Sequence, residues 1–155
     1  MSNITSSSIP AAWSRNVAIL TCMDTRVDPI KLLKLQLGEA HIIRNAGGRA
    51  TEDAIRSLVI SAALLDAPAV LVIHHTDCAM GRLTNEQLRE QARKRSNVAV
   101  SRVSRMDFLP FTNLDQSVRD DVAKIAVSPL IENKIVATGL VYDLSTGQLR
   151  KICSL

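Results

Sequence analysis

The fold is decided by two stretches of the chain, Asn16-Val-Ala-Ile-Leu-Thr-Cys-Met-Asp-Thr-Arg26 and Ala69-Val-Leu-Val-Ile-His-His-Thr-Asp-Cys78. Each stretch opens with a short aliphatic run, which is typical of a strand that is buried on both faces of a parallel sheet. Each run stops at cysteine or histidine, the residue types that bind soft metal ions. Metal-ligating side chains therefore stand where two buried strands are expected to end.

Strands and helices alternate along the rest of the chain. This alternation predicts an α/β fold, with a mostly parallel central sheet flanked by helices and an antiparallel strand at the C-terminal end. Residues 97–112 have no clear period, and residues 108–111 are expected to loop across the surface. The expected strands are residues 17–21, 40–44, 70–74, 134–142 and 149–153, and the expected helices are residues 29–36, 52–65, 84–95 and 114–127.

The length and composition are those of one globular domain, expected over residues 16–155 after an N-terminal extension of residues 1–15. Aromatic residues make up 3% of the chain, which argues against nucleic-acid binding by base stacking. No apolar stretch is long enough to cross a membrane, and the basic residues 89–95 are expected to form a solvated helix face. Three cysteines are an odd number, so we expect no disulfide framework and a reducing, cytoplasmic compartment.

Cys22, His75 and Cys78 are the candidate metal ligands. In a doubly wound sheet ligands bind beyond the carboxyl ends of the strands, and both motifs follow such ends. Two thiolates and one imidazole suit zinc, and three protein ligands are typical of catalytic zinc sites, which leave the fourth position open. Strand alternation points His74 away from His75, so packing or support of the site is expected for His74. An alternative is a Cys78 nucleophile activated by His75, but it leaves Cys22 unexplained.

Polar residues beside the two motifs suggest further roles. Asp24 and Arg26 lie two residues apart, so they share one side of an extended segment and form an ion pair easily. That pair is either a structural salt bridge or a device that holds Asp24 beside the metal. Asp28 and Asp77 are expected to serve as cap or turn residues. The segment 45–48, Asn-Ala-Gly-Gly, is either a simple turn or a close backbone approach to the site.

These motifs together resemble the β-class carbonic anhydrases. The resemblance rests on Cys22-x-Asp-x-Arg26, on Arg44-Asn-Ala-Gly-Gly48, and on His75-x-x-Cys78, and it extends from about residue 17 to residue 152. Gly139-Leu-Val-Tyr-Asp-Leu-Ser-Thr-Gly147 is similar to the family's last strand and turn. The chain looks like the short, minimal branch of the family, with a long N-terminal arm missing or reduced.

The resemblance implies a zinc-dependent catalytic domain with one Zn2+ per chain, bound by Cys22, His75 and Cys78. It makes Asp24 and Arg26 the catalytic dyad and implies a homodimer or a tetramer. The implied reaction is the reversible hydration of CO2 to bicarbonate by zinc-bound hydroxide. Carbonyl sulfide hydrolysis at the same site is the alternative, and a non-catalytic zinc-binding scaffold is a third reading.

The predicted substrate pocket contains Gly47, Gly48 and Ala79. Ala79 stands where the family usually has glycine after the second cysteine. Its methyl group is expected to narrow the pocket or to shift the Cys78 loop. The choice between CO2 and carbonyl sulfide is therefore expected to depend on this side of the pocket.

Overall fold

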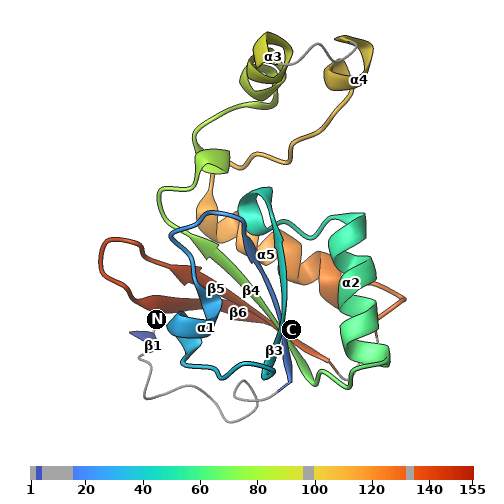
Figure 1. The fold of residues 1–155 in the computed structure, drawn as a ribbon, viewed down its shortest axis with the longest axis vertical. Helices are drawn as coiled ribbons and strands as arrows, with labels where there is room; N and C mark the ends of the chain where they lie inside the picture. The colour runs from blue at the N-terminus through green and yellow to red at the C-terminus, as the bar shows by residue number, and fades with distance from the viewer. Residues whose placement is uncertain (1–2, 5–15, 96–99, 132–134) are drawn as a thin grey trace.

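A six-stranded sheet lies at the centre of the computed structural model, which describes residues 3–4, 16–95, 100–131 and 135–155 (Figure 1). Across the described residues the strand order is β1-β6-β5-β4-β2-β3. The strands β2, β3, β4 and β5 all run parallel to one another, whereas β6 pairs antiparallel with both β5 and β1. The predicted fold class is therefore confirmed. The strands are β1 Asn3–Ile4, β2 Val17–Cys22, β3 Ala40–Asn45, β4 Ala69–His75, β5 Val136–Tyr142 and β6 Leu149–Ser154.

Part of the predicted N-terminal extension joins the sheet. Asn3 and Ile4 pair with Arg150 and Leu149 of β6, at the edge opposite β3. Residues 5–15 lie outside the described residues, so the proposed division between extension and domain stays a prediction. Residue 134, where the fourth expected strand begins, also lies outside them.

Helices cover both faces of the sheet. Ala18 and Leu20 of β2 belong to the core that packs under α2 and α5, whereas Val17 and Ile19 belong to the core on the opposite face, which α1 covers. Such double burial explains why β2 and β4 are continuous aliphatic runs. The helices are α1 Pro29–Leu33, α2 Glu52–Ala63, α3 Asn85–Arg95, α4 Val100–Ser104 and α5 Leu114–Ala126, with single 3-10 turns η2 Ala46–Gly48 and η3 Ala79–Gly81.

Most helix starts follow the expected capping chemistry. Asp28 and Thr51 accept hydrogen bonds from the backbone N–H groups three residues ahead, as N-cap residues do. The first helix was predicted to reach Gln36, which is wrong. It ends at Leu33, because Lys34 adopts a left-handed conformation and directs its N–H to the carbonyl groups of the last turn.

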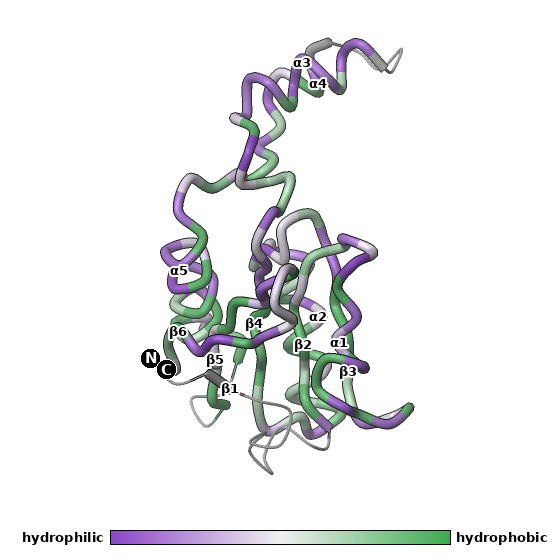
Figure 2. The backbone as a smooth tube through the Cα atoms, turned by 90° about the vertical axis from the view of Figure 1, so that its left-hand side faces the viewer, coloured by the Kyte–Doolittle hydropathy of each residue, from purple (hydrophilic) through white to green (hydrophobic). Residues whose placement is uncertain are grey.

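The pair α3 and α4 projects away from the sheet, beyond the carboxyl ends of the parallel strands (Figures 1 and 2). Thr84 and Gln87 form a capping box at the start of α3, in which each side chain accepts from the backbone N–H of the other residue. The tube through these helices is largely hydrophilic in Figure 2, but two of its basic residues are not simply solvated. Arg93 donates to Ser104 of α4, so it connects the two helices, and Arg89 donates to the carbonyl of Met106, two residues after α4 ends. No helix in the described part of the chain is long and apolar enough to cross a membrane.

The segment after α4 corrects the prediction of a surface loop. Phe108 and Phe111 are half-buried and pack against the buried side chains of Cys22, Cys78 and Met80. The backbone N–H of Phe111 also donates to the carbonyl of Met80, 3.1 Å away. Two of the chain's few aromatic rings therefore cover the end of the sheet where the predicted site lies.

Candidate metal centre

The structure brings the three candidate ligands together at the carboxyl ends of β2 and β4. Cys22 ends β2 and His75 ends β4, while Cys78 follows three residues later. These strands are adjacent and parallel, and strand order reverses beside them, because β3 and β4 lie on opposite sides of β2. The ligand atoms of the three residues lie within 4.8 Å of one another, and all three residues are buried.

The two sulfur atoms have the spacing of metal ligands rather than of a disulfide. The Sγ atoms of Cys22 and Cys78 are 3.9 Å apart, and all three cysteines are free. Two sulfur ligands at about 2.3 Å from a tetrahedral zinc ion lie roughly 3.8 Å apart. The separation in this chain therefore fits one tetrahedral ion between the two sulfur atoms.

His75 directs its Nε2 atom toward the two sulfur atoms. Its Nδ1 lies 2.8 Å from the carbonyl oxygen of Thr76, which can only accept, so Nδ1 carries the proton and Nε2 carries the lone pair. Nε2 is buried, and no hydrogen-bond partner for it lies among the described residues. Such a buried and unpaired acceptor is costly unless a metal ion or another ligand binds it. The donor set of Cys22, Cys78 and His75 thus fits zinc.

The two thiols are electrostatically coupled. The hydrogen bond with Cys78 holds the pKa of Cys22 well below its usual value, and the same contact, with burial, raises the pKa of Cys78. The contact between the two Sγ atoms uses one S–H proton, which either cysteine can supply. Zinc requires two thiolates, so binding should release that proton and become stronger as the pH rises.

Asp24 and Arg26 form the predicted ion pair beside this cluster. The Asp24 carboxylate receives both Nε and Nη2 of Arg26, at 3.0 and 2.7 Å, as well as the Arg26 backbone N–H. These hydrogen bonds hold the pKa of Asp24 well below its usual range. Oδ2 of Asp24 lies 3.9 Å from Nε2 of His75, so the carboxylate borders the place where the ligand atoms meet.

Asp77 does more than the predicted turn role. It accepts Nη1 of Arg26 at 2.9 Å and also pairs with Arg82, so it is a second carboxylate on the dyad arginine. Asp28, in contrast, is the N-cap residue that the sequence predicted. Arg44 donates hydrogen bonds to the backbone carbonyl groups of Cys22 and Asp24, and these bonds hold the backbone segment that joins the two residues.

His74 points to the other side of β4, as alternation predicts. Its ring lies 2.9 Å from Ser117 Oγ, 3.1 Å from the Gly48 carbonyl and 3.3 Å from Asp121. His74 does not belong to the cluster of candidate metal ligands, and its contacts with Gly48, Ser117 and Asp121 join the loop after β3 to α5.

The sequence reasoning missed Asp121, which organises this supporting layer. Asp121 accepts hydrogen bonds from the side chain of Arg49 and from the backbone N–H of Ala50. Burial raises the pKa of Asp121, but its hydrogen bonds with His74 and Arg49 outweigh burial and the net shift is downward. The signal was present in the sequence, because Asp121 shares the buried face of α5 with Val118, Val122 and Ile125.

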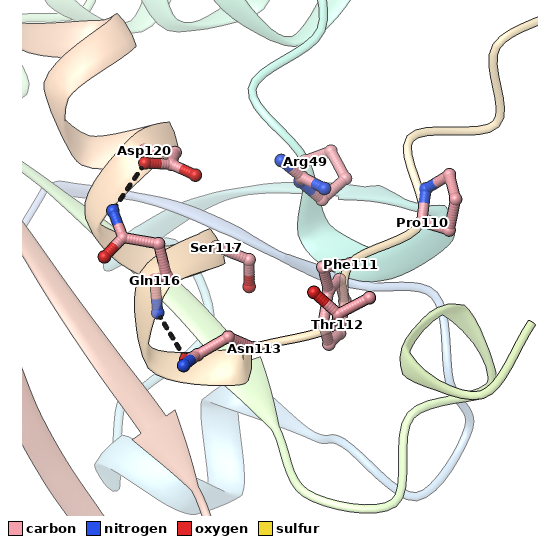
Figure 3. A pocket seen from close by; sticks show the side chains of 8 residues that line it. All are labelled: Arg49, Pro110, Phe111, Thr112, Asn113, Gln116, Ser117 and Asp120. Carbon is pink, nitrogen blue, oxygen red and sulfur yellow. Dashed lines mark hydrogen bonds between the residues drawn. The ribbon is translucent and has the colours of Figure 1, made fainter. Parts of the chain in front are cut away.

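Two of the cavities at this end of the sheet share Phe111 and Thr112 in their walls. The inner cavity has a volume of about 180 Å³ and touches the candidate metal ligands His75 and Cys78. The outer cavity, of about 280 Å³, lies between α5 and residues 110–112 (Figure 3). The inner cavity is lined by His75, Asp77, Cys78, Gly81, Arg82, Phe111, Thr112 and Leu114.

The predicted pocket residues are not among those that line the inner cavity. Gly47 and Gly48 are buried behind the ligands, whereas Ala79 is exposed on the turn after Cys78. A role for these three residues in substrate choice stays a prediction. The structure assigns Gly48 a clear packing role, because a Cβ atom there would lie 3.0 Å from the backbone nitrogen of Cys22.

Gly48→Ala is therefore expected to destabilise the protein and to weaken metal binding. Gly48 and Gly38 both have positive φ, 68° and 91°, but a Cβ atom at Gly38 would meet nothing within 4 Å. Gly38→Ala should lower the free energy of unfolding by only about 1–2 kcal/mol, because alanine is strained in the left-handed conformation. Gly48→Ala should lower it by about 1–3 kcal/mol more, because the added methyl group overpacks the site. Urea unfolding and zinc titration of both variants measure the difference, and equal losses would contradict the packing role.

Known proteins resemble this chain in sequence and in fold. A family model described as "Carbonic anhydrase" matches residues 17–149. Beta-carbonic anhydrase 1 of Mycobacterium tuberculosis is 34% identical over 146 residues, which cover 93% of this chain and 86% of that protein. A carbon disulfide hydrolase of Acidianus sp. is 34% identical over 158 residues, with 89% and 78% coverage. The crystal structure of carbonic anhydrase from Streptococcus mutans is 46% identical, with a TM-score of 0.83 and coverage of 90% of this chain and 82% of that chain.

Proposed function

This chain belongs to the β-carbonic anhydrase family of enzymes, and on that premise we propose that it hydrates CO2 reversibly to bicarbonate at one zinc ion per chain. The observation that carries the proposal is the convergence of two sulfur atoms and one unpaired imidazole nitrogen at the end of the sheet. Three ligands leave one position of a tetrahedral zinc ion for water or substrate.

The protein residues have distinct tasks in this reaction. Cys22, His75 and Cys78 hold the zinc ion, and the Thr76 carbonyl fixes the ring of His75 with Nε2 toward it. A zinc ion held by these residues would supply Lewis-acid chemistry, which makes a water molecule acidic enough to serve as the nucleophile for CO2.

Asp24 is the group that accepts a proton or hydrogen bond beside the zinc ligands. Arg26 holds its carboxylate ionised and fixed by two side-chain hydrogen bonds. A carboxylate that left Arg26 would be free to bind the zinc ion and to occupy the position that water needs. Arg26 thus holds the Asp24 carboxylate beside the zinc ion and prevents it from binding the ion.

Carbonyl sulfide hydrolysis, which gives H2S and CO2, is the second candidate function. A relative named carbon disulfide hydrolase, 34% identical over most of this chain, supports a sulfur-containing substrate for this scaffold. A non-catalytic zinc-binding scaffold is a third reading. This alternative is disfavoured because Asp24 and Arg26 are both present and paired, whereas a protein that has lost catalytic activity would need neither residue.

We also propose a homodimer or a tetramer that works in the cytoplasm. Free cysteines at the metal centre and at Cys153 suit a reducing compartment. No nucleic-acid or membrane partner is proposed. The small-molecule substrate is CO2 with bicarbonate or, in the alternative, carbonyl sulfide.

Turnover of the two substrates by one preparation separates these functions. The zinc-loaded protein is expected to hydrate CO2 in stopped-flow measurements with a pH indicator, and to release sulfide from carbonyl sulfide more slowly. Faster sulfide release would favour the alternative. No turnover of either substrate at full zinc loading would favour the scaffold.

A further inference from the structure

We propose that Asp77 is a positioning residue for the Arg26–Asp24 pair and that it fixes Arg26 so that Asp24 stays off the metal centre. The inference rests on the proposed function, because it concerns the dyad of that reaction. It assigns to Asp77 a task beyond the turn role that its place between His75 and Cys78 suggests.

The contacts of Arg26 carry the argument. The Nε and Nη2 edge of its guanidinium group faces Asp24, and Nη1 donates to Oδ2 of Asp77 at 2.9 Å. Nη2 also donates to the backbone carbonyl of Asp77 at 3.2 Å. The planar guanidinium is therefore held at both ends, by one carboxylate on the Cys22 loop and another on the Cys78 loop.

The backbone of Asp77 is set for this contact. Its φ is +59°, a left-handed conformation that non-glycine residues adopt only occasionally, with Asp and Asn among the more tolerant. In this conformation both the carbonyl and the carboxylate of Asp77 reach Arg26. Unusual backbone conformations of this kind cluster at functional sites, where the surrounding structure holds them in place.

Arg82 completes the network on the far side of Asp77. It pairs with Oδ1 of Asp77 while Arg26 takes Oδ2, so both carboxylate oxygens are occupied. Two carboxylates and two guanidinium groups alternate in this chain of contacts, and their formal charges cancel. Asp77 thus holds Arg26 without leaving an unbalanced negative charge at the wall of the inner cavity, which Asp77 and Arg82 both line.

Arg26 needs such support because its side chain is 49% exposed. An exposed ion pair is weak when only two partners make it, since water competes and long side chains lose conformational freedom. Without the Asp77 carboxylate the guanidinium group would keep its contacts with Asp24 and one hydrogen bond to the backbone carbonyl of residue 77, and Nη1 would lose its carboxylate partner. The pair would then move more freely, and Asp24 would spend more time at the metal ion.

Asp77→Gly tests this directly, because glycine accepts the left-handed conformation without strain. Asp66→Gly is the matched control: Asp66 is exposed, has a φ of +53°, and lies between α2 and β4, at the other end of the sheet from the ligands. We expect Asp77→Gly to keep its metal and to lower kcat about tenfold, a loss in the range for residues that orient a metal site. Asp66→Gly should keep full activity, and Asp77→Asn should lose less than Asp77→Gly because its amide oxygen still accepts from Arg26.

The visible absorption spectrum of the cobalt-substituted proteins gives a readout besides activity. We expect the Asp77→Gly spectrum to shift toward that of Arg26→Ala, since Asp24 is released from its place in both. An unchanged spectrum would overturn the inference, whether or not kcat falls, and so would an equal loss in Asp66→Gly. If the wild-type protein turns over neither CO2 nor carbonyl sulfide, the proposed function fails, and the spectra alone then decide the role of Asp77.

Discussion

Replacing His75 by alanine is expected to abolish zinc binding and to reduce CO2 hydration to the uncatalysed rate. Removing a group that merely orients a metal ligand costs about 10–100-fold in affinity or activity, so loss of a ligand should cost more. The variant keeps Cys22 and Cys78, but two ligands do not make a structural or catalytic zinc site. Zinc content by mass spectrometry and stopped-flow CO2 hydration measure the two losses.

A second histidine serves as the matched control for this variant. His41 lies on β3, and its Nδ1 is 2.6 Å from the hydroxyl oxygen of Ser61. Asparagine at that position keeps a nitrogen near Ser61, so His41→Asn should retain both zinc and activity. Full activity of His75→Ala would contradict the assignment of His75 as a zinc ligand. An equal loss of zinc and activity in His41→Asn would contradict it as well.

Thermal unfolding gives the same comparison in stability. A ligand that binds only the folded protein stabilises it by about 4 kcal/mol when its concentration is 1,000 times Kd. Wild-type protein should therefore melt at a clearly lower temperature after chelation and recover with added zinc. The melting temperature of His75→Ala should respond to neither treatment.

Arg26→Ala is expected to lose about 100-fold in kcat/KM, the scale expected when a reacting group is misplaced by about 1 Å. The same variant should keep its zinc, because Arg26 does not belong to the ligand cluster. Asp24 would lose its two side-chain hydrogen bonds and move onto the metal ion. Arg26→Lys should be hardly more active than Arg26→Ala, since an ammonium group cannot make two parallel hydrogen bonds to one carboxylate as a guanidinium group does.

Arg56→Ala is the control for general effects of arginine removal. Arg56 pairs with Asp53 on the surface of α2, with 68% of its side chain exposed, and lies outside both cavities. Activity near wild type is expected for this variant. Zinc loss in Arg26→Ala would contradict the proposal that Arg26 acts only by holding Asp24 away from the zinc ion, because the pair would then be part of the metal site itself.

The sequence predicted those parts of the molecule that depend on a local pattern. β2 and β4 were found because strands buried on both faces are continuous aliphatic runs. The ligand cluster followed from them, since adjacent parallel strands end at one edge of the sheet. Asp28 was also predicted as a cap or turn residue from local chemistry, and it is the N-cap residue of α1.

Features that depend on contacts between distant segments were missed. Asp121 lies 71 residues from Ala50, so its place on the buried face of α5 could be read from the sequence, but its partners became visible only when α5 packed on the sheet. Phe111 was placed on the surface because nothing near it in sequence shows that it stacks on His74, with ring centroids 5.8 Å apart. Asp77 was assigned a turn role because its partner, Arg26, is 51 residues away.

The most direct test of the account is a zinc titration of the metal-free protein during stopped-flow CO2 hydration. Zinc bound by Cys22, His75 and Cys78 as the catalytic ion predicts a linear rise in activity with an end point at one zinc ion per chain. A fully loaded protein that hydrates CO2 no faster than buffer, or activity that does not depend on zinc, would contradict it.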